Sequence, residues 1–451
     1  MDDLLDFAVS LGEGTVEARA EDITTESIIL ENGILRSVES HVRIGIGVRV
    51  LLGGRTGYAC TTRLSRERVR DSVERAARQA SNGFNGSAPI SVDERDPVKG
   101  RTEQCIDEAT TEDRISLVTR AYESAVEHGK DASSVEASHN HTYGRRYFRS
   151  SDGSDVVWDF LTNSLFTGVT SRGSNGLAEG YDSHGGSFDI SRFVGDISPE
   201  KIGERAAMHA SEILMAKACP AGRFRALIDP RLAGVLAHEA FGHMCECDSV
   251  IAGESVLKGR IGERLGAEAA TIIDDGSGAI AMPYDDEGTP AKRVVMLDRG
   301  VLSGYLHSRR TAHEMGTDAT GNARAVSYKH EPICRMRNTY FAPGDMSENE
   351  AVRELDNGIC AIGTIGGESG SDGTFLFKTM YGYMVKNGEI LYPLKGAALM
   401  GNILEFFKGV EGATKKVRME AGSCGKNGQF PLLVGMGGPH LLINDVTFGG
   451  E

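Results

Sequence analysis

The sequence contains no uninterrupted run of about 18 or more apolar residues, the length that a membrane-spanning helix requires. Its first residues, Met1 to Asp6, are acidic, whereas a secretory signal begins with a basic segment. Both observations argue against a membrane or secretory destination. We therefore expect a cytoplasmic protein that makes no contact with a membrane.

Basic residues are also in deficit. The chain has 49 lysines and arginines against 64 aspartates and glutamates, a formal net charge of −15. Such a charge disfavours binding to the phosphates of nucleic acid, so no nucleic-acid partner is expected. The eight cysteines are scattered through 451 residues, unlike the closely spaced cysteines of a disulfide framework. We expect most of them to be reduced thiols.

Several enzyme signatures are incomplete or absent. Gly45-Ile46-Gly47 lacks the third glycine of a dinucleotide-binding loop and lies in an alternating strand pattern. Gly425-Lys426-Asn427 lacks the Ser/Thr and the upstream spacing of a phosphate-binding loop. The G-x-S-x-G elbow of serine hydrolases does not occur.

Strand and helix patterns alternate in the first half of the chain. The expected elements are a hairpin over 27–38, a strand over 42–50, helices over 65–80 and 112–128, a hairpin over 145–166 and a helix from 199 to about 217. Pro220-Ala221-Gly222 ends that helix, so we place a domain boundary there. The predicted fold is α+β in two domains. A mixed sheet-and-helix domain covers residues 1–219, and a β-rich domain covers residues 220–451.

The segment from Leu236 to His243 contains two histidines and a glutamate within an apolar stretch that is typical of a helix. It resembles the zinc-protease signature H-E-x-x-H with one extra residue between the histidines. On a straight α-helix, His238 and His243 would lie roughly 140° apart, too far to bind one ion. A π-type turn would bring the two rings together, and Gly242 tolerates such a distortion.

A catalytic zinc site uses three protein ligands and a water molecule, so the two histidines need a third ligand. We choose Cys424, because flanking glycines allow close backbone approach and Lys426 favours a thiolate. Cys245 and Cys247 are a rival source close to His243. A Cys-x-Cys pair without a second pair is nevertheless a weak zinc signal.

Zinc makes a coordinated water acidic, with a pKa near about 7. Glu239 is placed to accept the proton of that water and to pass it to a leaving amine, which predicts metal-assisted peptide hydrolysis. The residues alone leave an alternative open. In that alternative, His238 and His243 are helix residues satisfied by hydrogen bonds, and Cys424 is a buried, inert thiol.

Two further polar clusters favour a structural interpretation. The acidic segment from Asp285 to Pro290 is more typical of a capped turn between strands than of a cation site. His139 and His141 alternate along a strand that we expect to be exposed, and they need no function.

The segment from His238 to His243, followed by Glu246 and Asp248, resembles the H-E-x-x-x-H segment of the TldD/PmbA (TldD/TldE) metallopeptidases, a family also labelled modulators of DNA gyrase. Other segments that resemble blocks of this family are Asp285–Pro290, Thr320–Arg324, Arg335–Thr339, Gly401–Asn402 and Cys424–Gln429. The resemblance covers the whole length and is densest in the second half.

This resemblance implies a Zn2+ site of His238, His243 and Cys424 with Glu239 as the catalytic acid/base, the same set that the chemistry suggests. Some members have lost the metal motif and serve as a partner subunit. The present chain keeps every motif position, so the resemblance implies a TldD-like catalytic subunit. It also implies unfolded or short peptide substrates, cleaved in a cavity closed by a dimer with a TldE/PmbA-like partner or a second copy.

Two other functions compete with this one. The first is a non-catalytic regulatory or binding protein of the same family. The second is a zinc hydrolase that acts on an amide other than a peptide. Intact His238, Glu239, His243 and Cys424 argue against the first, because a scaffold does not need that combination of residues.

Overall fold

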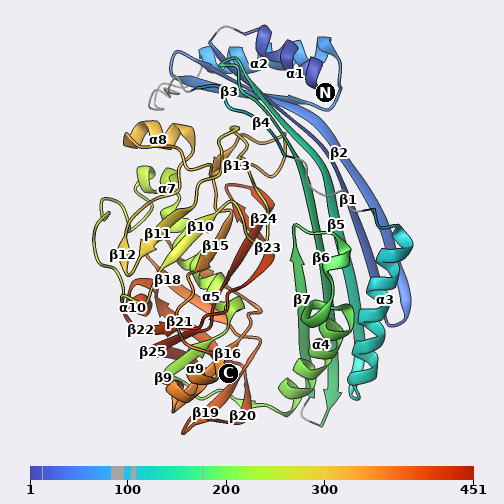
Figure 1. The fold of residues 1–451 in the computed structure, drawn as a ribbon, viewed down its shortest axis with the longest axis vertical. Coiled ribbons are helices and arrows are strands. Elements are labelled where there is room, and N and C mark those ends of the chain that lie inside the picture. Colours follow the sequence, from blue (N-terminus) through green and yellow to red (C-terminus); the bar gives the residue numbers. More distant parts are fainter. Residues whose placement is uncertain (13, 83–95, 103–107, 175, 451) are drawn as a thin grey trace.

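The computed structural model describes residues 1–12, 14–82, 96–102, 108–174 and 176–450. One large sheet forms the N-terminal half, and the C-terminal half is built on three further sheets (Figure 1). Helices and strands are mixed along the chain, which confirms the α+β class. Within the described residues, no helix is long and apolar enough to cross a membrane.

The N-terminal sheet has seven strands and is built from long antiparallel hairpins. In the order β3-β2-β1-β5-β6-β4, with β7 also paired to β6, its strands are β1 (Thr15–Glu31), β2 (Ile34–Leu52), β3 (Arg55–Thr61), β4 (Lys99–Thr102), β5 (Ala132–Ser150), β6 (Asp155–Gly173) and β7 (Gly176–Gly186). Asn32 and Gly33, at the centre of the hairpin predicted over 27–38, have φ of 49° and 77°, as an Asn-Gly hairpin turn requires. The hairpins are present where predicted, but they are longer.

Four helices pack on one face of this sheet. They are α1 (Asp2–Ser10), α2 (Arg66–Asn82), α3 (Thr111–His128) and α4 (Pro199–Met215), with short 3-10 turns η1 (Ile190–Arg192) and η2 (Gly195–Ile197) before α4. The three predicted helices are therefore confirmed within about two residues at each end. Ser198 caps α4 by accepting a hydrogen bond from the Lys201 amide.

The opposite face of the sheet contacts the C-terminal half. Ile23 and Phe160 pack there against Ile280 and Met282. Successive side chains of a strand point to opposite faces of the sheet. The helices cover one face, and the second half of the chain covers the other. Figure 1 shows the sheet curving around the C-terminal half.

The exposed position expected for His139 and His141 is wrong, because each side chain is only 1% exposed. His139 packs edge-on against Phe193. The ring of His141 forms a 3.0 Å hydrogen bond between its Nδ1 and Oδ1 of Asn163. The strand itself was predicted correctly, but the residues that bury these two histidines come from later in the chain.

The C-terminal half contains a ten-stranded sheet, a six-stranded sheet and a two-stranded ribbon. The ten-stranded sheet comprises β17 (Gly366–Ser369), β18 (Thr374–Lys378), β21 (Ala398–Asn402), β25 (Leu441–Gly449), β9 (Gly222–Ile228), β16 (Gly358–Ile362), β19 (Tyr381–Lys386), β20 (Glu389–Lys395) and β8 (Lys217–Ala218) in spatial order, with β22 (Val410–Ala413) on β25. The six-stranded sheet comprises β12 (Val301–Leu302), β11 (Val294–Asp298), β10 (Ile272–Asp275), β15 (Asn338–Phe341), β24 (Gln429–Gly438) and β23 (Arg418–Lys426). The ribbon is β13 (Ala323–Arg324) with β14 (Ile333–Cys334).

A segment of four short consecutive helices lies between the ten-stranded and the six-stranded sheets. It consists of α5 (Pro230–Val235), the π-helix η3 (Leu236–Gly242), α6 (His243–Cys245) and α7 (Cys247–Ala252). Outside it are α8 (Arg309–Met315), α9 (Glu348–Leu355) and α10 (Ile403–Lys408). Asp229 caps the segment by accepting a hydrogen bond from the Leu232 amide, as an aspartate before a proline at the first helical position commonly does. The segment contacts β15 and β24 of one sheet and β16 and β17 of the other.

Candidate metal centre

The helical segment contains the π-type turn that the spacing of its histidines predicts. Residues 236–242 are π-helical, and the His243 amide donates to the carbonyl of His238, five residues earlier. The two imidazole rings consequently face the same region, with centroids 5.2 Å apart. The extra residue between the histidines is therefore absorbed by the backbone.

Gly242 has a different role from the one expected. Its φ of −59° and ψ of −44° are ordinary helical values that any residue adopts. A Cβ built at this position would lie 2.0 Å from Sδ of Met336. A side chain here would force the buried Met336 to move, so close packing against that residue, and not backbone freedom, favours glycine.

Cys424 approaches the two histidines from β23, at the edge of the six-stranded sheet. Its Sγ lies 3.4 Å from Nε2 of His243, and one ligand atom from each of His238, His243 and Cys424 lies within 4.8 Å of the others. Within the described residues, this is the one such group of three or more His, Cys, Asp or Glu side chains. Cys245 and Cys247 belong to the hydrophobic core and do not join it.

The burial of His238 is the clearest indication that this cluster binds a metal ion. Its side chain is 0% exposed, and neither ring nitrogen has a hydrogen-bond partner among the described residues. A buried polar group without a partner costs free energy. Two imidazoles and a thiol are a donor set that suits Zn2+, so these residues fit a zinc ion.

The thiol of Cys424 has an unusual acidity. Burial would raise its pKa, but the imidazoles of His238 and His243 outweigh that effect and lower the pKa to about 5. The thiolate is the form that binds metals. Lys426, which the sequence suggested as the activating cation, forms ion pairs with two carboxylates instead.

Glu239 extends its carboxylate toward both histidines. Its oxygens lie 4.0 Å from Nε2 of His238 and 3.5 Å from Nε2 of His243, and the side chain is about one third exposed. The Glu239 carbonyl accepts a 2.7 Å hydrogen bond from the Ser369 hydroxyl on β17. This contact holds the π-turn against the ten-stranded sheet and leaves the carboxylate free to face the centre.

Glu246 is a polar neighbour of the centre to which the sequence analysis assigned no role. Its Oε2 lies 2.9 Å from Nδ1 of His243. Burial would raise the pKa of Glu246, but His243 and Lys426 lower it to about 2, so this carboxylate is an acceptor. An Nδ1–H that donates to Glu246 leaves Nε2 of His243, which faces Cys424, as the ring nitrogen available to a metal. The sequence feature that could have revealed this contact is the position of Glu246 three residues after His243, since residues at this spacing are neighbours on a helix.

The acidic segment from Asp285 to Pro290 is a capped turn, as predicted, but it is buried. Oδ1 of Asp285 accepts hydrogen bonds from the amides of Glu287 and Thr289. Arginines of the N-terminal half approach its other carboxylates, Arg19 at Asp286 and Arg49 at Glu287. The turn therefore joins the two halves.

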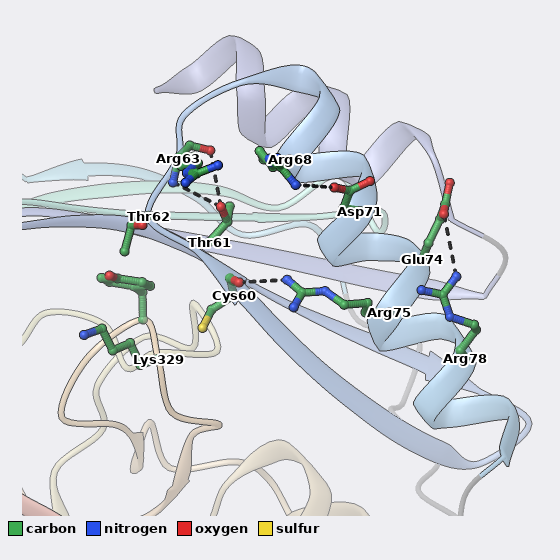
Figure 2. Close-up of a pocket in the computed structure, with 11 residues that line it drawn as sticks. Cys60, Thr61, Thr62, Arg63, Arg68, Asp71, Glu74, Arg75, Arg78 and Lys329 are labelled. Carbon is green, nitrogen blue, oxygen red and sulfur yellow. Dashed lines mark hydrogen bonds and ion pairs between the residues drawn. The ribbon is translucent and has the colours of Figure 1, made fainter.

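A charged hollow of about 530 Å³ lies elsewhere, between α2, the end of β3 and a loop of the C-terminal half (Figure 2). Its lining is Cys60, Thr61, Thr62, Arg63, Arg68, Asp71, Glu74, Arg75, Arg78, Tyr328 and Lys329. On α2, Arg68 pairs with Asp71 and Arg78 with Glu74 at the exposed surface. The hollow shares no residue with the candidate metal centre.

The fold and this cluster of histidines, cysteine and glutamate define an α+β protein with a candidate metal centre between its sheets. Family models match three stretches, described as PmbA/TldA metallopeptidase domain 1 (residues 16–80), central domain (106–214) and C-terminal domain (221–450). The chain belongs to the PmbA/TldD metallopeptidase family.

Related proteins match nearly the whole length of this chain. A metalloprotease of Methanothermobacter thermautotrophicus is 34% identical, over 96% of this chain and 95% of its own. A zinc metalloprotease TldD homolog of Saccharolobus solfataricus is 28% identical, over 98% of both chains. The fold resembles that of TldE from Thermococcus kodakarensis, with a TM-score of 0.83 at 18% identity and complete coverage of both chains.

The expectation of two domains is wrong in number, since the family models divide the chain into three. The N-terminal half contains two of these stretches. Strands β1 to β3 from the first and β5 to β7 from the second share one continuous sheet. That shared sheet is why the sequence pattern shows no break between them.

Proposed function

We propose that the protein is a zinc-dependent peptidase of the H-E-x-x-x-H type, with His238, His243 and Cys424 as ligands. The observation that carries this proposal is the fully buried imidazole of His238, which has no hydrogen-bond partner among the described residues and faces a second imidazole and a thiol. The zinc metalloprotease name of the Saccharolobus solfataricus relative supports the choice of metal.

A zinc ion held there would supply Lewis acidity, polarising a peptide carbonyl and making a water molecule more acidic. Glu239 is then the general base and acid. Its carboxylate reaches the space beside both histidine Nε2 atoms, and its partial exposure admits substrate and water. It accepts a proton from the attacking water and returns it to the amine that leaves. Glu246 holds the ring of His243 in one tautomer.

The position of Cys424 supports an extended peptide as the substrate. β23 is the last strand of its sheet and pairs only with β24 among the described strands. An unfolded or short peptide can add to such an edge through backbone hydrogen bonds, with little dependence on sequence. A folded protein has most of its backbone hydrogen-bonded internally, so we propose unfolded or short peptides as the substrates.

We further propose that this chain is the catalytic, TldD-like subunit, and that it works in the cytoplasm. Its full set of His238, Glu239, His243 and Cys424 supports that role. The structural similarity to a TldE supports a TldE/PmbA-like partner, or a second copy of this chain, as the other subunit of a dimer. The net charge of −15 supports a function without nucleic acid.

Cleavage of an unstructured peptide by the zinc-loaded protein, compared with Glu239→Gln, tests this function. The variant keeps the ligands, so it should bind zinc normally while its rate falls by about 10²–10⁴. Cleavage that survives in Glu239→Gln would contradict the assigned base. A zinc-loaded wild type that cleaves no peptide, with or without a partner subunit, would favour the non-catalytic binding protein. A screen of non-peptide amides tests the remaining alternative, a zinc hydrolase that acts on an amide other than a peptide.

A further inference from the structure

Lys426 makes a triple contact close to the candidate metal centre. Its Nζ lies 3.0 Å from Oε2 of Glu246 and 2.6 Å from Oδ1 of Asp248, and it donates to the Cys334 carbonyl at 3.2 Å. The lysine side chain is 12% exposed, and that of Glu246 is 1% exposed. An ammonium has three N–H donors, so these three acceptors use its whole capacity. Lys426 therefore has no donor left for a substrate or for a thiolate.

The contact joins the two segments that carry the candidate ligands. Lys426 follows Cys424 by two residues on β23, whereas Glu246 follows His243 by three residues in the helical segment. The same oxygen of Glu246 lies close to both Nδ1 of His243 and Nζ of Lys426. A continuous path of hydrogen bonds thus runs from the imidazole to the strand of the cysteine.

We propose that Lys426 is a positioning residue that fixes Cys424 relative to His243 and thereby sets the affinity of the centre for zinc. This role rests on the metal site proposed above, but not on peptide cleavage. Its physical basis is preorganisation. Ligands on two segments, about 180 residues apart in sequence, bind a metal more tightly when their relative position is fixed beforehand.

Charge balance supports the same role. Without Lys426, Glu246 and Asp248 would be two carboxylates close together with no cation between them, and Glu246 is fully buried. Their repulsion would turn Glu246 away from Nδ1 of His243, and loss of the Lys426 contacts would release the helical segment from β23. In either case the ring of His243 loses its fixed orientation. Loss of such an outer partner typically lowers metal affinity by about 10–100-fold.

The test is the zinc dissociation constant of Lys426→Met, measured by competition with a chromophoric chelator. We expect it to rise by about 10–100-fold over wild type. Lys408→Met is the matched control, because Lys408 pairs with Glu405 at the exposed surface and should bind zinc as wild type does. Lys426→Arg, which keeps the cation, and Lys426→Met/Asp248→Asn, which removes one carboxylate, should each recover part of the lost affinity.

Substitution by Co2+ gives a second readout. The charge-transfer absorption between a thiolate and Co2+ should weaken or shift in Lys426→Met, because Cys424 is no longer held in place. Unchanged zinc affinity and an unchanged cobalt spectrum, even with a lower stability toward urea, would overturn the role of Lys426 and leave the metal site intact. A wild type that binds no zinc would overturn the site itself together with this role. Neither the zinc affinity nor the cobalt spectrum depends on peptide cleavage.

Discussion

Arg49 contacts Glu17 within its own sheet and Glu287 in the other half of the protein, at 2.5 Å and 2.7 Å. Arg309, from the C-terminal half, reaches back to the same Glu17. All four side chains are nearly inaccessible to solvent, with exposures of 8% or less. Each half thus contributes one arginine and one carboxylate to a buried network of ion pairs. This network fixes the N-terminal sheet over the C-terminal half.

Removal of one member of this network should destabilise the protein strongly. Glu287→Gln leaves Arg49 buried with one carboxylate fewer, and we expect the free energy of unfolding in urea to fall by about 3–5 kcal/mol. Glu200→Gln is the control, because Glu200 pairs with Arg120 at the surface with both side chains about half exposed. That change should cost less than about 1 kcal/mol. Equal effects of the two substitutions would contradict the buried network.

This network shows where the sequence was insufficient for the fold. The turn signals at Asn32-Gly33 and the cap at Asp229 are local, and local chemistry places both correctly. The charges of Arg49 and Glu287 look like those of a solvated face when each segment is considered alone. Their burial depends on a partner more than 200 residues away, which no local pattern contains.

The same distinction applies to the candidate centre. The spacing of His238 and His243 was sufficient to predict the π-turn, because the geometry of a helix fixes where side chains point. The link between Glu246 and Lys426 was not predictable, since it depends on how β23 packs against the helical segment. The role of Gly242 was misjudged for a similar reason, because Met336 lies almost 100 residues later in the chain, between β14 and β15.

Gly242→Ala should therefore disturb the centre through packing. The new methyl group would collide with Sδ of Met336, and overpacking of this kind costs about 1–3 kcal/mol. We expect a lower stability toward urea and weaker zinc binding by the adjacent His243. Met336→Ala creates space, so the double variant should be more stable than the sum of the single effects predicts. Strict additivity in the double-mutant cycle would contradict this explanation.

The buried ring of His307 should make stability depend on pH. Burial lowers the pKa of His307 to about 4, below the unfolded value of about 6.5. Below pH 6.5 the unfolded chain takes up a proton that the folded protein resists, so stability is lost as pH falls from about 6.5 to 4. Between pH 7.5 and 5 this amounts to about 2 kcal/mol.

His307→Gln should lack this part of the pH dependence, as judged from urea unfolding at the two pH values. His41→Gln is the control, because the His41 side chain is 75% exposed and should leave the dependence as in wild type. An identical slope in wild type and His307→Gln would show that His307 does not titrate as stated.

Zinc should stabilise the folded protein, because an unfolded chain does not bring Cys424 to the histidines. A ligand at about 100 times its dissociation constant adds about 2.7 kcal/mol to the free energy of unfolding. Thermal unfolding with zinc and with a chelator should consequently differ in wild type. The difference should disappear in His238→Ala, whereas Cys245→Ser should retain it, since Cys245 lies in the hydrophobic core.

X-ray absorption at the zinc edge of the zinc-loaded protein tests the central claim most directly. The account predicts a first shell with two imidazole nitrogens and one sulfur, and loss of the sulfur in Cys424→Ser. A wild-type shell without sulfur, or a sulfur that persists in Cys424→Ser, would contradict a centre built from His238, His243 and Cys424.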